Sequence, residues 1–172
     1  MGETLTVLKT RRSCRSYQDT PVPKETVEKI LEAGTYAATG KGRQAPIIIA
    51  VMKKELRDRL SELNRRFRRS DIDPFYGAPQ VLVVLADRSV ETYLYDGSCV
   101  MANMMNAASD LGVASCWIHR AKEVFDIPEG KEILKELGIT GDYEGIGNLV
   151  IGYAKGDLKE AAPRKADYIY WA

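Results

Sequence analysis

The sequence has one histidine and three cysteines in 172 residues, and this scarcity excludes several kinds of site. A structural zinc site needs clustered Cys and His ligands, but His119 stands alone and no Cys-x-x-Cys pair occurs. We therefore expect no metal site. Cys14, Cys99 and Cys116 are odd in number and widely spaced, which argues against a disulfide framework and favours a reducing compartment.

Signature motifs of common enzyme classes are missing as well. There is no Gly-x-Ser-x-Gly elbow and no Gly-x-Gly-x-x-Gly turn, and Gly40-Lys41-Gly42 is not part of a Walker pattern. None of the cysteines is followed six residues later by the Arg that we expect of a phosphatase nucleophile. Either the protein only binds a ligand, or a bound cofactor carries the chemistry.

The chain also has little net charge and no long apolar run. Its 25 Lys and Arg balance 24 Asp and Glu, so no global attraction to nucleic acid or to an anionic membrane is expected. The basic cluster Arg65-Arg66-Phe67-Arg68-Arg69 is interpreted as an exposed helix end. No stretch reaches the roughly 18 apolar residues of a spanning helix, and the N-terminus does not resemble a signal peptide. We expect a cytoplasmic protein that binds neither nucleic acid nor a membrane.

Apolar periodicity divides the chain into alternating helices and strands. Helices are predicted from about residue 3 to the first arginines and over 24–38, 53–69, 92–111 and 129–137. Short apolar runs rich in β-branched residues predict buried strands over 46–51, 80–86, 113–118 and 146–153, the first of them an interior strand. The length suits one domain over residues 1–172. The interleaving predicts a three-layer α+β or α/β fold around a sheet of four or more strands.

Two polar stretches are candidates for ligand binding. Arg11-Arg12-Ser13-Cys14-Arg15-Ser16-Tyr17 places three guanidinium groups beside hydroxyl donors, and an Arg fork can bind two phosphate oxygens at once. The alternative is a solvated basic helix end. The second stretch, Thr39-Gly40-Lys41-Gly42-Arg43-Gln44, is a loop whose glycines allow close approach to a ligand.

Three patches together resemble the FMN-dependent nitroreductase family: residues 11–17, residues 37–44 and residues 112–118. A weaker match is Ile151-Gly152-Tyr153 with Pro163-Arg164-Lys165 beyond it. The resemblance implies a nitroreductase-like α/β/α sandwich with a mixed or antiparallel central sheet. It also implies an obligate homodimer that binds two FMN molecules at its interface, with the tail of about 161–172 contacting the partner subunit. Such an enzyme reduces nitroaromatic, quinone or related small-molecule acceptors with NADH or NADPH by ping-pong hydride transfer.

The resemblance assigns the cofactor contacts to three groups of residues. The FMN phosphate and ribityl chain would be held by Arg11, Arg12, Ser13 and Arg15, joined by Arg164 or Lys165. The pyrimidine edge of the flavin would meet the loop residues Thr39, Lys41, Gly42, Arg43 and Gln44. The flavin N5 and O4 would receive main-chain N–H groups from Ile118 and His119. The cations of the loop would favour the anionic reduced flavin.

The chain departs from the family pattern at three places. The family commonly has Asn where Gly42 stands, Pro-Trp where Ala45-Pro46 stands, and Gly where His119 stands. Because the flavin itself carries the hydride, no side chain is assigned as catalytic; His119 is a candidate proton donor, and its alternative is a hydrogen-bonding residue at a strand end. Two other functions remain open: a flavin- or nucleotide-binding protein without turnover, and a dehalogenating or ring-remodelling enzyme on the same scaffold.

Overall fold

Four apolar runs of the sequence pair into one antiparallel sheet in the computed structural model, which describes residues 3–68 and 71–172. Its strands are β1 (Pro46–Val51), β2 (Gln80–Asp87), β3 (Ala114–Ile118) and β4 (Tyr143–Gly152). Their order across the sheet is β1-β2-β4-β3, and each neighbouring pair is antiparallel. The long strands β2 and β4 therefore form the centre of the sheet.

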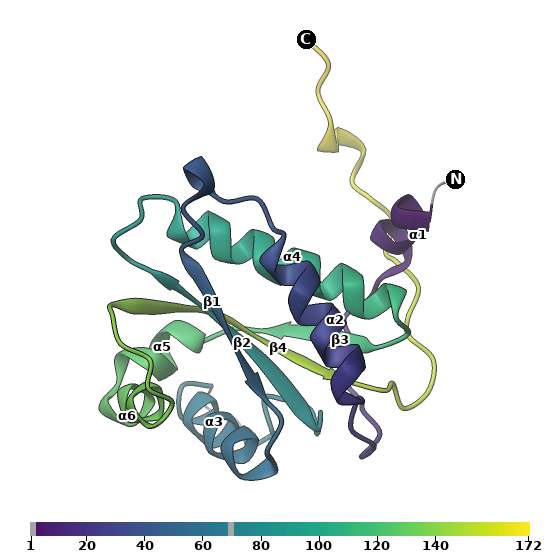
Figure 1. Ribbon diagram of the computed structural model, residues 1–172. Helices are drawn as coiled ribbons and strands as arrows, with labels where there is room; N and C mark the ends of the chain where they lie inside the picture. The colour runs from purple at the N-terminus through teal and green to yellow at the C-terminus, as the bar shows by residue number, and fades with distance from the viewer. Residues whose placement is uncertain (1–2, 69–70) are drawn as a thin grey trace.

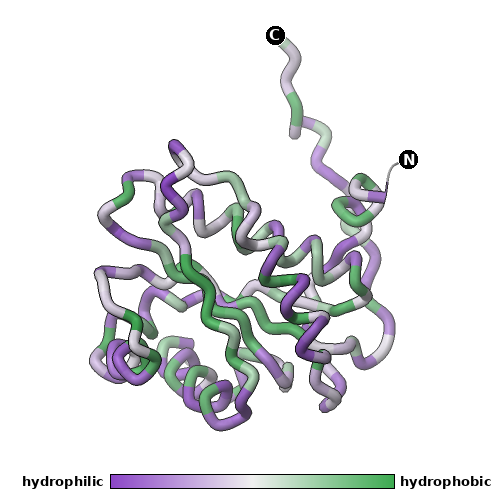
Figure 2. Tube along the Cα trace, viewed as in Figure 1, coloured by the Kyte–Doolittle hydropathy of each residue, from purple (hydrophilic) through white to green (hydrophobic). Residues whose placement is uncertain are grey.

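Helices cover both faces of this sheet (Figure 1). One face carries α2 (Lys24–Thr35) and α4 (Tyr93–Asp110), and the other carries α3 (Lys54–Arg66), α5 (Ala121–Asp126) and α6 (Pro128–Glu136). Successive residues of β2 alternate between two hydrophobic clusters: Val83 packs toward α3, α5 and α6, and Val84 toward α2 and α4. Hydropathic colouring shows the same three layers, with apolar strands at the centre (Figure 2). The three-layer α+β prediction is confirmed.

The predicted elements are found, with three differences in the central body. Helix α5 was not predicted, because six residues are too few for a helical period to be recognised. The prediction of an interior strand over 46–51 is wrong, because β1 pairs only with β2 and forms an edge of the sheet. An apolar run of β-branched residues indicates that both faces of a strand are covered. It does not indicate how many strands lie beside it. The predicted helix over 53–69 ends at Arg66, and Arg69 lies outside the described residues.

The connection from α3 to β2 is held by the carboxylate of Asp73. This carboxylate accepts hydrogen bonds from the Arg57 guanidinium, the Ser61 hydroxyl, and the N–H groups of Phe75 and Gly77, at 2.9 and 2.7 Å for the two amides. Arg57 is itself buried, and its Nε donates to the Ala78 carbonyl at 2.9 Å. Burial acts to raise the pKa of Asp73, but these hydrogen bonds outweigh it and hold the pKa below its usual value.

We expect Asp73→Ala to lower the free energy of unfolding by about 2–4 kcal/mol, because it removes four acceptor contacts and leaves a buried guanidinium short of a partner. The folded pKa of Asp73 is depressed, so its contribution is complete above the unfolded pKa of about 3.9 and is lost as the pH falls below it. Urea unfolding at pH 7 and pH 3 measures both effects. A similar loss for the exposed control Asp71→Ala, or an unchanged difference at pH 3, would contradict this role.

Candidate functional site

The arginine-rich segment 11–17 is fixed to the ends of two strands. Ser13 forms a parallel bridge with Ser115 of β3, and the Cys14 N–H donates to the Ser115 carbonyl at 2.9 Å. Tyr17 bridges Ala154, which follows β4. Cys14 and Tyr17 are buried, whereas Ser13, Arg15 and Ser16 are exposed. The sheet therefore holds the backbone of this segment and leaves its polar side chains at the surface.

Tyr17 anchors the segment as a neutral phenol. Burial raises its pKa, and the neighbouring Cys14 acts in the same direction. Its hydroxyl donates to the Cys14 carbonyl at 3.0 Å. Burial also raises the pKa of the Cys116 thiol on β3, while Arg15 acts to lower it, which places the Arg15 charge close to this strand. The two buried thiols are thus part of the packing beneath the segment.

Two arginines of the segment behave differently. The Arg12 guanidinium folds back on helix α1 (Glu3–Thr10), where it donates to the Lys9 carbonyl at 2.9 Å and to the Arg11 carbonyl. The Arg11 Nη1 atom is buried and has no hydrogen-bond partner among the described residues. A buried donor without a partner costs free energy unless a ligand or water satisfies it. Arg12 Nε is likewise buried without a partner among the described residues, so both arginines keep a donor that an anion could satisfy.

A cavity of about 480 Å³ opens beside these groups. It is lined by residues 12–16 and by residues 155–160, which follow β4. The Lys155 N–H donates to the Ser16 carbonyl at 3.0 Å and ties the two walls together. Lys155 and Lys159, which the sequence did not single out, add two cations to the wall. The wall also carries the carboxylates of Asp157 and Glu160, so four cations face two anions and the cavity keeps a net positive charge that suits an anionic group.

The loop Thr39–Gln44 lies over the N-terminal end of α4. The Gly40 N–H donates to Asp96 Oδ1 of α4 at 2.9 Å, and the Gln44 N–H donates to Thr39 Oγ1 at 3.2 Å. Lys41 and Gln44 adopt positive φ angles of 54° and 51°, a conformation that is costly for residues with a Cβ atom. The side chains of Lys41, Arg43 and Gln44 are exposed. The loop is thus held in a strained form with its polar side chains free.

The loop and the arginine segment lie at opposite ends of α4 (Figure 1). Helix α1, which leads into the segment, lines a cavity with Asn103, Asn106 and Asp110 of the last turns of α4. The 18 residues of α4 span about 27 Å. One chain therefore does not bring the two predicted groups of cofactor residues together.

The tail residues predicted to join the site point elsewhere in this chain. Arg164 donates to the nearby Ala162 carbonyl through Nε and Nη2, and the Lys165 ammonium lies 5.6 Å from the centre of the Tyr168 ring. Neither residue contacts Arg11 among the described interactions. The tail itself extends away from the sheet and helices (Figure 1).

Buried asparagines hold the predicted main-chain donors at the end of β3. Asn64 of α3 donates from Nδ2 to the His119 carbonyl at 2.8 Å, and Asn148 of β4 lies 3.5 Å from the Ile118 carbonyl. The His119 side chain is exposed. Sequence reasoning missed Asn64, although an asparagine beside Leu60 and Leu63 on the buried stripe of a helix is a signal that could have been noticed.

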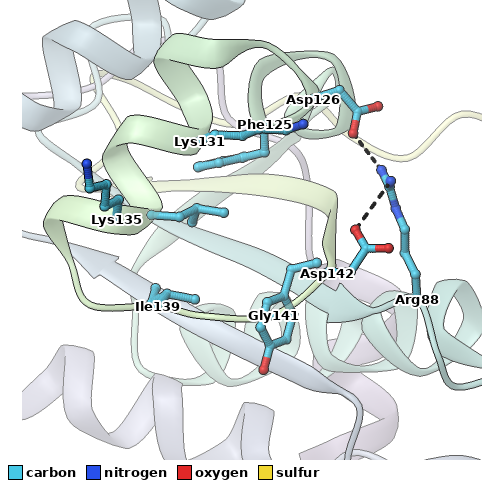
Figure 3. A pocket seen from close by; sticks show the side chains of 10 residues that line it. Arg88, Phe125, Asp126, Lys131, Lys135, Ile139, Gly141 and Asp142 are labelled. Atoms are coloured by element: carbon cyan, nitrogen blue, oxygen red, sulfur yellow. Dashed lines mark hydrogen bonds and ion pairs between the residues drawn. The ribbon is translucent and has the colours of Figure 1, made fainter.

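Another cavity, of about 350 Å³, lies under the connection from α6 to β4 and contains none of the predicted site residues (Figure 3). Arg88 lines this cavity and forms ion pairs with Asp126 at 2.5 Å and with Asp142 at 3.6 Å. Burial acts to raise the pKa of Asp126, but Arg88 and Lys122 outweigh it and lower the pKa. The Arg88 charge is already paired with carboxylates, and none of the predicted site residues lines this cavity, so it is the weaker candidate.

The basic cluster at the end of α3 is occupied by internal partners. Arg65 pairs with Glu62 at 2.8 Å, and Arg66 pairs with Glu129 at 2.8 Å. The Arg68 guanidinium lies 5.6 Å from the centre of the Tyr76 ring. In the described part of the chain, no helix is both long and apolar enough to cross a bilayer, and no group of His, Cys, Asp or Glu side chains has the arrangement of a metal site.

Comparison with known proteins identifies relatives along the whole chain. The model of the nitroreductase family matches residues 8–70. A protein of Archaeoglobus fulgidus with the provisional name NADH dehydrogenase/NAD(P)H nitroreductase is 32% identical over 172 residues, which are 95% of this chain and 94% of that protein.

Solved structures agree with this relationship. A nitroreductase with bound FMN from Bacteroides fragilis is 29% identical, with full coverage of both chains and a TM-score of 0.91. A nitroreductase with bound FMN from Desulfitobacterium hafniense is 26% identical, again over both full chains, with a TM-score of 0.89. The three-layer fold on a four-stranded sheet and the Archaeoglobus relative, which is 32% identical over 95% of this chain, lead to one assignment: the chain belongs to the nitroreductase family.

Proposed function

We propose that the protein is an FMN-dependent oxidoreductase that takes electrons from NADH or NADPH and passes them to nitroaromatic, quinone or related acceptors in a ping-pong cycle. The observation that carries this proposal is the arginine segment itself: the buried Nη1 of Arg11 has no hydrogen-bond partner among the described residues, and the adjoining residues 12–16 line a cavity together with Lys155 and Lys159. When bound, FMN supplies the hydride-transfer chemistry that the side chains of this protein lack. The protein residues bind and orient it.

The residues of the arginine segment 11–17 and of the 480 Å³ cavity next to it in the chain fit a phosphate monoester. Arg11 offers a free guanidinium nitrogen, and Ser13 and Arg15 are exposed at the same segment. Hydrogen bonds between ionised groups are about twice as strong as neutral ones, so a dianionic phosphate would satisfy Arg11 well. Arg12 uses Nη1 and Nη2 to bind the carbonyls of Arg11 and Lys9, which would fix the backbone of the segment, and its Nε is left without a partner among the described residues. Arg164 and Lys165 would have to come from a partner or from a rearranged tail.

The other predicted residues fit the ring end of the cofactor. Lys41 and Arg43 would place positive charge near the pyrimidine edge, Gln44 would offer a neutral donor, and Thr39 and Gly42 would shape the loop. Ile118 and His119 would present main-chain N–H groups. The exposed His119 imidazole would be free to donate a proton to the acceptor, or to hydrogen-bond it.

We also propose that the working protein is a homodimer of single-domain chains of residues 1–172. The two halves of the predicted site lie at opposite ends of α4, so a second chain is needed to complete each site. Large apolar side chains are exposed and could be covered by a partner chain. They are Leu5 and Leu8 of α1 and the tail residues Tyr170 and Trp171, and Trp171 is 93% exposed. The edge strand β1 has the composition of an interior strand, which is expected if a partner segment covers it.

The three free cysteines suit a cytoplasmic location.

Electron transfer separates this proposal from a flavin-binding protein without turnover. We expect anaerobic NADH or NADPH to bleach the visible absorption of the holoprotein, and p-nitrobenzoate or a benzoquinone to restore it. Stopped-flow absorbance in two separate mixing steps also tests the ping-pong order. A protein that stays yellow with both nucleotides binds flavin without turnover. Release of halide or a remodelled ring, identified by mass spectrometry of the product, would indicate a dehalogenating or ring-remodelling enzyme.

For Arg11→Ala we predict a folded protein with about 10- to 150-fold weaker FMN binding, because one charged hydrogen bond contributes roughly 1.5–3 kcal/mol. The control is Arg59→Ala, which removes the same charge from an exposed pair with Glu136. Titration of both apoproteins with FMN at fixed salt, followed by quenching of flavin fluorescence, measures the difference. Equal dissociation constants for the two variants would remove Arg11 from the phosphate site.

Truncation after Ala162 is predicted to give a colourless, less stable species, because it removes both Arg164-Lys165 and the exposed aromatic residues. Bound FMN at 100 times its dissociation constant should stabilise the full-length dimer by about 2.7 kcal/mol, and an obligate interface buries more than about 2,000 Å². The double variant R164A/K165A separates the two effects: it should stay dimeric and bind FMN more weakly. Sedimentation velocity measures the oligomeric state of each variant, and melting curves measure its stability. A truncated chain that is dimeric, yellow and equally stable would contradict the coupling of dimerisation to FMN binding.

A further inference from the structure

Cys14 and Cys116 lie opposite each other where the arginine segment meets the sheet. The parallel bridge between Ser13 and Ser115 fixes the register, and the Cys14 N–H donates to the Ser115 carbonyl at 2.9 Å. Cys14 and Cys116 are therefore the next pair along these two stretches of backbone. Adjacent strands lie about 4.8 Å apart. A disulfide requires Cα atoms roughly 4.4–6.8 Å apart, so the spacing of this pair suits one.

The two thiols also lie on the same side of the sheet. Successive residues of a strand alternate between its faces, so the pair next to a bridge shares the face opposite to that of the bridged residues. Both cysteines are 2% exposed and belong to one hydrophobic cluster, together with Phe125 and Val150. Burial raises the pKa of Cys116, Arg15 acts to lower it, and Cys14 acts to raise it. This influence of one thiol on the other requires the two sulfur atoms to be near each other.

The backbones of the two cysteines are held with different firmness. Cys116 is inside β3 and pairs with Val150 of β4. Cys14 lies in a segment without a helix or a long strand, which is attached to the sheet by the bridges Ser13–Ser115 and Tyr17–Ala154. Local opening of such a segment costs less free energy than opening of a strand within the sheet. Cys14 is therefore the thiol that a small reagent reaches first.

We propose that Cys14 and Cys116 form a reversible disulfide that fastens the arginine segment to β3 under oxidising conditions. Both cysteines are free in this structure, which is the reduced form. In the exchange with oxidised glutathione, the Cys14 thiolate attacks the glutathione disulfide, forms a mixed disulfide and releases one glutathione thiolate. The Cys116 thiolate then attacks the Cys14 sulfur and releases the second. The protein loses two protons and two electrons, and the oxidant becomes two glutathione thiols.

The link would restrain the backbone of the segment that carries Arg11, Arg12 and Arg15. It closes the long loop from residue 14 to residue 116, and closure of a long loop restricts the unfolded chain. A restrained segment also loses less conformational entropy when it binds an anion. A transient disulfide is compatible with a reducing compartment, in which the thiols are regenerated. The inference concerns the chain alone and does not depend on the proposed function.

The test uses the variant Cys99→Ser, which removes the exposed third thiol and keeps the pair. After equilibration of the folded protein with oxidised glutathione, its intact mass should fall by two hydrogen atoms, and digestion without a reducing agent should give two peptides joined through Cys14 and Cys116. Dithiothreitol should reverse both changes. The oxidised form should melt about 5 °C or more above the reduced form. The controls Cys14→Ser and Cys116→Ser on the same background should show neither the link nor the rise in melting temperature.

Hydrogen exchange at the Cys14 amide measures whether the link fastens the segment. Because this N–H bonds to Ser115, its exchange should slow about tenfold or more in the oxidised form. An unchanged rate would contradict the fastening. A folded protein that keeps both thiols, or that stops at a glutathione adduct, would overturn the disulfide itself. A linked peptide that forms only in urea would do the same, since the folded chain would then not bring the two sulfur atoms together.

Discussion

The attachment of residues 13–17 across the ends of β3 and β4 is the constraint on which the candidate site depends. The segment has no helix or long strand of its own; its position comes from the bridges Ser13–Ser115 and Tyr17–Ala154. Close approach is possible because residue 152 is glycine: a Cβ there would lie 2.9 Å from the Tyr17 ring and 2.9 Å from Pro79. A free arginine is useful for binding only when its backbone is held in this way, because less entropy is lost on binding.

A second constraint follows from the length of α4. The helix packs closely on its neighbours, since a Cβ at Gly97 would lie 2.5 Å from Ile146 of β4 and one at Gly34 of α2 would lie 2.7 Å from Met104 of α4. This rigid helix separates the arginine segment from the loop Thr39–Gln44. If both bind one cofactor, they belong to different chains. Dimerisation and cofactor binding would then be coupled, so that each strengthens the other. The exposed aromatic tail and the open edge of β1 would belong to the same dimer interface.

Sequence patterns predicted the parts of this fold that depend on local periodicity. The long helices α2, α3 and α4 and the four strands follow from apolar spacing, because each buries one face or stripe against the sheet. The place of β1 at an edge depends on pairing between residues distant in sequence, which no local pattern contains. For the candidate site, Arg11 was predicted from its charge and its neighbours, and its role in binding stays a prediction. Asn64 was not, because its role arises only when α3 packs against the turn after β3.

Backbone strain in this protein is concentrated where the ring end of the cofactor is proposed to bind. Lys41, Gln44, Tyr76 and Arg120 are the non-glycine residues with positive φ in the described ranges. Tyr76 belongs to the connection that Asp73 holds, and the other three lie in the loop and the turn assigned to the flavin. Each costs of order 1–3 kcal/mol, which the two hydrophobic layers must offset. Asp96 and Asn64, both buried, supply the local bonds that keep the strained residues in place. The same sheet and helices that stabilise the fold therefore also hold the strained loop and turn in place.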